Sequence, residues 1–182
     1  MSKTFSEFIL HCFNDYADCG STLVFIDIAE NYAEDTYELK YTDDGKPFDP
    51  DIFKNMHDPS AISEKFRKYG LGLMELIGNI EGIGGKIIIA NDKDNGIAYT
   101  LTCKRSDPKR PAIGNIADTL SQLSSTYPTI DIDFTITTAE DSFHFDTREV
   151  KFVLEDVSIS NPGVQKYIKT MIAENIDQIK AT

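Results

Sequence analysis

The segment from Asp43 to Leu73 constrains this chain more than any other part of its sequence. It opens with turn residues, Asp43-Asp44-Gly45-Lys46-Pro47, directly after a run that alternates like a strand. It closes with Gly70-Leu71-Gly72-Leu73, which leads into the apolar run 74–80. About twenty polar residues separate the two ends, and long segments of this kind are often lids over binding sites. This order of turn, long polar segment and glycine-flanked helix start predicts a nucleotide pocket under a loop. The alternative is that the turn at Asp43 is an ordinary one, the polar segment is a plain surface loop, and the glycines only permit close packing.

The two ends of this segment offer complementary chemistry. A carboxylate at a strand end, such as Asp43, can accept a hydrogen bond from an exocyclic amino group like that of adenine. Gly45 would let a flat ring approach the backbone without a side chain in the way. Gly70 and Gly72 precede an apolar helix, whose N-terminus leaves backbone donors free and favours an anion. We therefore expect the base at Asp43 and the phosphates at the helix start.

Hydrophobic periodicity places regular elements on both sides of this segment. The first run is amphipathic, with its apolar side chains at spacings of three and four residues. Two pairs of strands are each predicted to form an antiparallel hairpin, the second around an Asn-Gly turn. The expected elements are a helix over 4–18, strands over 23–28 and 37–41, a helix over 74–80, and strands over 85–90 and 97–103.

The net charge of the chain limits its partners. The charge is −12 and the isoelectric point is about 4.6, so long-range attraction to nucleic acid is not expected. A bound phosphate must be held locally, by backbone N–H groups or a metal ion. The three cysteines, Cys12, Cys19 and Cys103, match no metal-binding spacing, and an odd, low count is typical of a reducing cytosol. The start lacks a signal pattern and no apolar run approaches a membrane span, which predicts a cytoplasmic protein.

The C-terminal part, residues 106–182, follows a linker rich in proline and charge. Its pattern predicts a helix, three strands and a helix. Two arrangements are open: a separate small α+β module for a protein partner, or strands that extend the first sheet. His144 lies between two phenylalanines and is predicted to be a strand residue facing water, not a ligand. The expected elements are a helix over 113–123, strands over 129–137, 142–146 and 149–157, and a helix over 164–179.

The order of helix, hairpin, Asp-x-Gly, lid, Gly-x-Gly helix and hairpin resembles the GHKL ATPase superfamily over about residues 5–105. That superfamily includes histidine kinases, DNA gyrase, heat-shock chaperones and anti-sigma-factor serine kinases. The string from Asp43 to Pro50 looks most like the anti-sigma-factor branch. The resemblance implies a two-layer α/β sandwich of the Bergerat type over residues 1–105, with residues 106–182 as an extension or small module.

The resemblance also implies roles for individual residues. Asp43 would bind the adenine amino group and Gly45 would line the base. Gly70 and Gly72, with the amides of Leu71 and Leu73, would hold the phosphates. Lys68 stands where the family often has the first glycine of this box, which is a departure.

The first helix departs further from the family, which has a catalytic Glu and, four residues later, an Asn that holds Mg²⁺. Matching the helix end puts His11 and Asp15 at these positions. His11 could act as a base near neutral pH, and Asp15 could bind Mg²⁺ through oxygen. Asn14 is the other candidate metal ligand, but it would put Leu10 at the base position. The alternative is that these residues form a solvated helix face.

Three functions follow from the resemblance. The first is an ATP-binding regulator similar to anti-sigma-factor serine/threonine kinases, which uses Mg²⁺ and acts on a protein partner such as a sigma-like regulator. The second is a catalytically inactive module in which ATP or ADP orders the 48–68 lid. The third is a degenerate scaffold that binds no nucleotide. Whether the chain is an enzyme and whether it forms a homodimer are left open, because function does not follow from fold alone.

Overall fold

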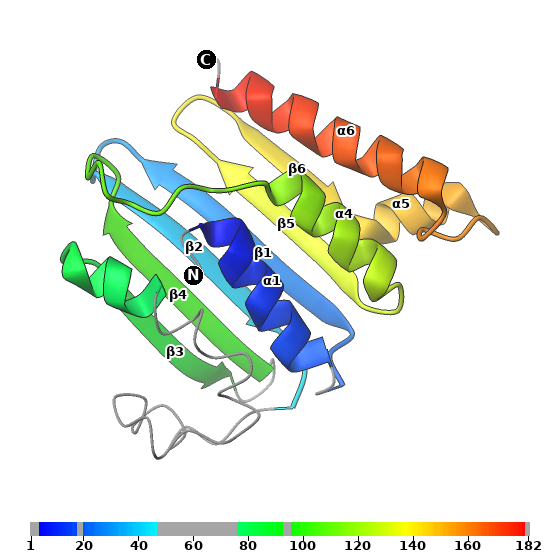
Figure 1. Cartoon of the computed structure of the whole chain (residues 1–182), viewed down its shortest axis with the longest axis horizontal. Helices are drawn as coiled ribbons and strands as arrows, with labels where there is room; N and C mark the ends of the chain where they lie inside the picture. The colour runs from blue at the N-terminus through cyan, green and yellow to red at the C-terminus, as the bar shows by residue number, and fades with distance from the viewer. Residues whose placement is uncertain (1–3, 18–19, 47–75, 93–95, 181–182) are drawn as a thin grey trace.

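The computed structural model describes residues 4–17, 20–46, 76–92 and 96–180, without the side chains at positions 15, 16, 91, 92 and 180. Six strands form one mixed sheet in the order β3-β4-β2-β1-β5-β6 (Figure 1). Only β1 and β5 are parallel; every other neighbouring pair is antiparallel. The strands are β1 (Leu23–Asn31), β2 (Thr36–Asp43), β3 (Lys86–Asp92), β4 (Gly96–Lys104), β5 (Asp131–Thr137) and β6 (Ser142–Asp146).

The C-terminal strands continue the sheet that the N-terminal strands begin. β1 pairs with β5 from Leu23↔Asp131 to Ala29↔Thr137. Of the two arrangements open from the sequence, strands that extend the first sheet are therefore the one observed. The pairing also explains why β1 is so apolar on its inner face, since Val24, Ile26 and Ile28 lie in the middle of the sheet and are buried.

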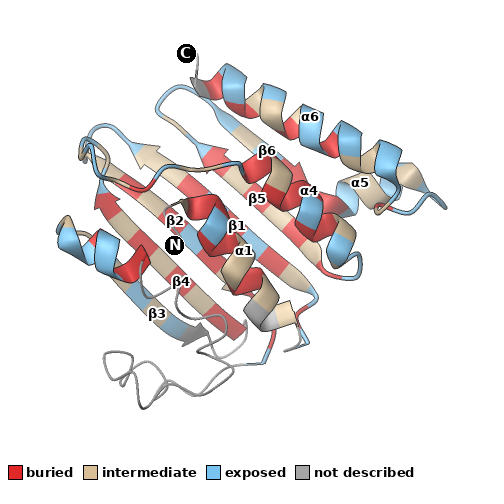
Figure 2. Cartoon of the chain, in the orientation of Figure 1, coloured by how far each residue is buried: buried red, intermediate tan, exposed pale blue. Residues whose placement is uncertain are grey.

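Helices cover one face of this sheet and bury the apolar core between the two layers (Figure 2). The first helix begins with a capping box, in which Thr4 accepts from the amide of Glu7 and the Glu7 carboxylate accepts from the amide of Thr4. Its ring side chains pack onto the sheet: Phe5 stacks on Tyr37 with ring centroids 4.8 Å apart. The helices are α1 (Phe5–Tyr16), a helix over 76–82, α4 (Ile116–Thr126), α5 (Thr147–Leu154) and α6 (Pro162–Lys180).

The predicted elements agree with this architecture except in one place. The helix over 4–18, both hairpins, the strands over 129–137 and 142–146 and the last helix are confirmed with small shifts at their ends. The strand predicted over 149–157 is wrong, because residues Thr147–Leu154 form α5. Asp146 caps this helix by accepting from the amide of Arg148, at 2.7 Å. The signal missed in the sequence was this capping residue, with Glu149 in the first helical turn.

The opposite face of the sheet carries the polar half of each strand's alternation. Phe25 is 41% exposed and Ile88 is 60% exposed, but their cross-strand partners are polar: Thr42 and Asp133 for Phe25, and Thr100 for Ile88. Lys40 pairs with Glu38 at 2.9 Å, and Thr102 donates to Glu38. In the described part of the chain, no helix is long and apolar enough to cross a membrane.

Candidate functional site

Asp43 is a buried carboxylate at the last residue of β2. It is 1% exposed and lies opposite Val24, the second residue of β1. Its Oδ1 accepts two hydrogen bonds, from the amide of Gly45 at 2.8 Å and from Ser21 Oγ at 3.0 Å. Its Oδ2 is buried and has no hydrogen-bond partner among the described residues. A buried carboxylate oxygen without a donor is costly, so this arrangement is typical of a site completed by a ligand.

Two glycines pack tightly around this carboxylate. A Cβ on Gly45 would lie 2.4 Å from Ser21 Oγ and 2.8 Å from Asp43 Oδ1. Gly96, at the start of β4, has φ +71°, and a Cβ there would lie 2.5 Å from the Asp43 carbonyl oxygen. The sequence predicted that Gly45 gives room to a flat ring. In the structure, its missing side chain gives room to the hydroxyl and the carboxylate that hold each other in place.

Burial raises the pKa of the Asp43 carboxyl above its usual range, and the hydrogen bonds from Gly45 and Ser21 offset part of that rise. Asp44 next to it behaves in the opposite way. Its carboxylate accepts from the amides of Thr22, at 2.7 Å, and Leu23, at 2.9 Å. Its slight burial raises the pKa, but these bonds and the Thr22 hydroxyl outweigh it and lower the pKa of Asp44. Asp44 therefore ties the end of β2 to the start of β1, and of the two neighbours Asp43 is the one with an oxygen that lacks a described partner.

The other residues predicted for the nucleotide are only partly within the described structure. Gly70, Leu71, Gly72 and Leu73, and the lid over 48–68, lie outside the described residues. The helix that follows is present over 76–82. Its Leu76 and Ile80 are fully buried in the common core. Both halves of the predicted nucleotide site therefore stay predictions, and the structure describes only the surroundings of Asp43.

The helix α1 carries the residues predicted to act on the phosphates. His11 is half-buried, and burial lowers its pKa from the ordinary value. Asp15 lies in the last turn of α1, and its side chain lies outside the described part. Asn14 Oδ1 accepts from the hydroxyl of Tyr127 at 2.7 Å, so this alternative metal ligand already has a structural partner.

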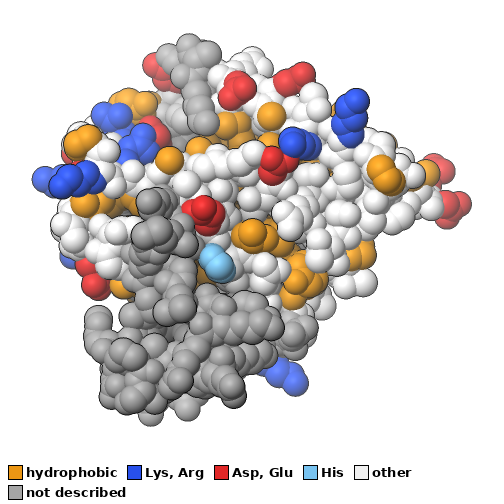
Figure 3. Space-filling view, viewed as in Figure 1, with side chains coloured by type: hydrophobic (Ala, Val, Ile, Leu, Met, Phe, Trp, Pro, Cys, Tyr) orange, Lys and Arg blue, Asp and Glu red, His pale blue; other side chains and the backbone are white. Residues whose placement is uncertain are grey.

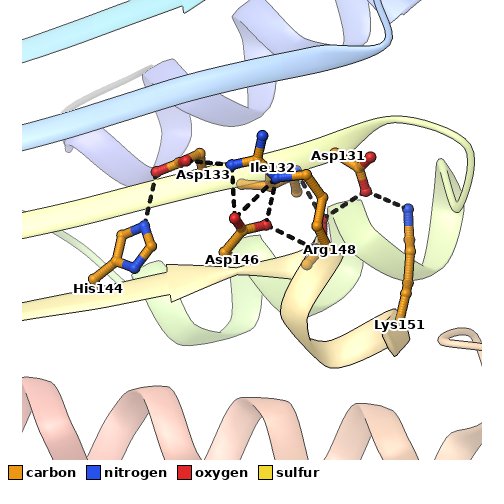
Figure 4. A network of polar contacts seen from close by, with 8 residues as sticks. Asp131, Ile132, Asp133, His144, Asp146, Arg148 and Lys151 are labelled. Atoms are coloured by element: carbon orange, nitrogen blue, oxygen red, sulfur yellow. Dashed lines mark hydrogen bonds and ion pairs between the residues drawn. The ribbon is translucent and has the colours of Figure 1, made fainter. Parts of the chain in front are cut away.

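A second group of carboxylates lies at β5 and β6, on the opposite face of the sheet from Asp43 (Figure 4). Asp133, His144 and Asp146 could offer three ligand atoms within 4.8 Å of one another. Arg148 already lies among them, 2.6 Å from both Asp133 Oδ2 and Asp146 Oδ2. His144 Nε2 lies 2.9 Å from Asp133 Oδ1 and is exposed, as the strand pattern predicted. A divalent cation would have to displace the guanidinium, so the ion pairs explain this group without a metal.

The sequence reasoning did not find two of the residues that build the Asp43 site. Ser21 follows the first helix and has no predicted role, but it is 7% exposed and donates to Asp43. Gly96 is predicted only as a turn residue, but in the structure its backbone packs directly against the Asp43 backbone. Neither role leaves a local signal, because both depend on the pairing of β2 with its two neighbours.

The comparisons with known proteins add no assignment to this geometry. No family model matches the chain, and no curated protein matches it.

Proposed function

We propose that this chain is an ATP-binding regulatory protein with a Bergerat-type fold, which binds Mg-ATP and acts on a protein partner in the manner of anti-sigma-factor serine/threonine kinases. The observation that carries the proposal is the buried Asp43 carboxylate, whose Oδ2 lacks a partner among the described residues. A mixed sheet with helices on one face is compatible with a Bergerat sandwich. The order of sequence motifs around residues 43–73 is the second support.

The geometry of Asp43 favours a ligand that donates a hydrogen bond. Its Oδ1 is already held by Ser21 and Gly45, so the direction of Oδ2 is fixed before a ligand arrives. The ionised carboxylate has only acceptor capacity. An exocyclic amino group therefore fits Oδ2, whereas a carbonyl oxygen at the same place would leave two acceptors facing each other. Adenine presents such an amino group, and this match makes ATP or ADP the proposed ligand.

The remaining parts of the site belong to the proposal alone. Gly70, Leu71, Gly72 and Leu73 would hold the phosphates through backbone amides at a helix start. Mg²⁺ would be held by Asp15, and when bound it would neutralise phosphate charge. His11 would accept a proton from the attacking group, and its lowered pKa keeps the imidazole neutral near pH 7.

A nucleotide-gated binding module without catalysis is the second candidate. It is favoured by two features of the first helix: His11 stands at the position that the resemblance assigns to a catalytic Glu, and Asn14 is engaged with Tyr127. In such a module, ATP or ADP would complete the Asp43 site and order a surface for the partner, but no phosphoryl group would be transferred.

Calorimetric titration of the full chain tests the proposal directly. We expect ATP to bind and GTP, which has a carbonyl oxygen in place of the adenine amino group, to bind at least tenfold more weakly. Asp43→Ala should weaken ATP binding by about 10- to 150-fold, which corresponds to losing one charged hydrogen bond of about 1.5–3 kcal/mol. Titration with and without Mg²⁺ shows whether the metal contributes to binding.

The control is Asp27→Ala, which removes an exposed carboxylate from β1, the strand next to Asp43. Its side chain lies on the open face of the sheet, so ATP affinity should not change. Equal loss in both variants, or no ATP binding by the wild-type chain, would refute the proposal. Phosphorylation or hydrolysis that is lost in His11→Ala would favour the kinase-like candidate; binding without either would favour the gated module.

A further inference from the structure

A cleft lies at the end of the sheet away from Asp43. It has a volume of about 420 Å³ and is lined by the last residues of β1 and β5 and by the segment after β4. Glu30 in this cleft is six positions along β1 from Val24, the residue paired with Asp43. At the rise of an extended strand this is a separation of about 20 Å. The cleft is therefore a different place from the proposed nucleotide site.

The topology of the sheet explains why a cleft forms here. β1 and β5 are the parallel pair, and their carboxyl ends lie at the same edge. The chain leaves β1 toward β2 on one side and leaves β5 toward β6 on the other. The cleft lies between these two diverging hairpins and the segment after β4. The cleft lining fits this description, with Ile28 and Glu30 from β1 and Ile136 and Thr138 from the end of β5.

Arg110 is the cation at the centre of the cleft. Its guanidinium lies over the ring of Tyr37, 4.3 Å from the centroid, and its contact with Glu30 is long, at 3.4 Å. The Arg110 side chain keeps 29% of its surface exposed. A guanidinium has five donors in a planar fork, so most of this capacity remains for a ligand.

Arg105 lies in a second hollow of about 260 Å³ that shares Glu30, Arg110 and Thr138 with the first. Its guanidinium stacks on Tyr32, 3.9 Å from the ring centroid. Its Nε is buried and has no hydrogen-bond partner in the described part of the chain. In the space-filling view, basic, acidic and hydrophobic side chains gather over this edge, at the upper left (Figure 3). Two arginines in joined hollows, one with an unsatisfied buried donor, indicate a missing acceptor.

We propose that this cleft binds a small organic acid with one carboxylate and an apolar body, held by Arg110 and Arg105. A planar carboxylate matches the guanidinium fork and would replace the weak contact with Glu30. The apolar walls, formed by Ile28, Ile136 and the two prolines of the linker, favour a hydrocarbon or aromatic body. Glu30, Asp107 and Glu140 also face the two hollows, so a multiply charged phosphate is disfavoured.

Phenylacetate is a suitable probe, with phenylacetamide as its uncharged counterpart and inorganic phosphate as the purely ionic one. We expect phenylacetate to bind the full chain and to shift amide resonances of residues in the cleft, such as Tyr37 and Thr138. Phenylacetamide and phosphate should bind about tenfold more weakly or not at all. Phenylacetate binding does not require ATP at the Asp43 site. The experiment therefore tests the cleft independently of the proposed function.

Three variants localise the binding. Arg105→Met removes the unsatisfied guanidinium, and Arg110→Lys keeps the charge but loses the planar fork; each should weaken phenylacetate by about tenfold. Lys109→Met removes an exposed positive charge from the same loop and should have no effect. Unchanged melting temperatures confirm that each variant is folded. No phenylacetate binding by the wild-type chain, equal binding of phenylacetamide, tighter binding of phosphate, or equal loss in Lys109→Met would overturn the proposal.

Discussion

Two buried carboxylates of this sheet have opposite environments. Asp43 is 1% exposed, accepts two neutral hydrogen bonds on one oxygen, and leaves the other without a described partner. Asp146 is 8% exposed, but both of its oxygens accept from the Arg148 guanidinium. The pKa of Asp43 is raised by burial. Burial also raises that of Asp146, but the Arg148 hydrogen bonds outweigh it and lower the pKa.

This difference separates a carboxylate that is satisfied within the protein from one that the described residues satisfy only in part. A carboxylate with a cationic partner has already recovered its lost hydration within the protein, so it contributes to stability. Asp43 keeps one oxygen without a partner among the described residues, and under the proposed function a ligand would complete it.

The largest expected effect is the loss of stability in Asp146→Ala. This change removes the N-cap of α5 and leaves Arg148 without its main partner, so we expect a loss of about 2–4 kcal/mol in the free energy of unfolding. Asp43→Ala should change stability by less than about 1 kcal/mol, or increase it, because it removes a poorly compensated buried charge. Urea unfolding of both variants measures the contrast. A larger loss in Asp43→Ala would mean that its environment is as satisfied as that of Asp146.

The next effect concerns the glycines, where two positions with similar backbone conformation differ in their surroundings. Gly96 has φ +71° and a Cβ there would meet the Asp43 backbone, whereas Gly84 has φ +75° and nothing within 4 Å. Gly84→Ala should cost about 1 kcal/mol, for the backbone alone. Gly96→Ala should cost about 1–3 kcal/mol more and should also weaken ATP binding, because the Asp43 site must shift. Thermal unfolding measures the two stability losses, and calorimetry measures ATP affinity. Equal stability losses in Gly84→Ala and Gly96→Ala would show that the contact with the Asp43 backbone is easily relieved.

A smaller effect is expected for Ser21→Ala. Losing this donor should weaken ATP binding by about 5- to 10-fold, equivalent to one net hydrogen bond. It should also raise the pKa of Asp43 further, so the acidic limb of the affinity profile moves to higher pH. Calorimetry across pH measures both quantities. Ser142→Ala, an exposed serine at the start of β6, is the control and should leave the profile unchanged.

The pH dependence of stability should be the smallest contrast, and its sign should differ between the two carboxylates. The lowered pKa of Asp146 gives a contribution that is present above the unfolded-state pKa and lost as pH falls through the folded-state pKa. Asp146→Asn should therefore flatten the acid limb of the stability curve. The raised pKa of Asp43 predicts the reverse: Asp43→Asn should stabilise most above the folded-state pKa, and the gain should vanish in acid. Unfolding curves at several pH values test both signs.

Much of the fold could be predicted from local pattern, because 23–28 is rich in branched and aromatic residues, 97–103 alternates, and 4–18 has helical spacing. The parallel pairing of β1 with β5 could not, since it joins segments far apart in the sequence and leaves no local pattern. The strand predicted over 149–157 was wrong because branched residues outweighed the Asp146 cap in that interpretation. Asp43 could be found as a carboxylate at a strand end, but the burial of one oxygen and the roles of Ser21 and Gly96 are properties of the assembled sheet.

The position of β1 in the middle of the sheet has a consequence for how the molecule folds and how it can be cut. A fragment that ends near residue 105 would keep β1 to β4 but expose the unpaired N–H and C=O groups of β1 along a long, apolar edge. Such an edge recruits other copies, so this fragment should self-associate. During synthesis of the intact chain, the same edge of β1 is closed only once β5 has been made, so the N-terminal half cannot complete the sheet before the C-terminal half follows.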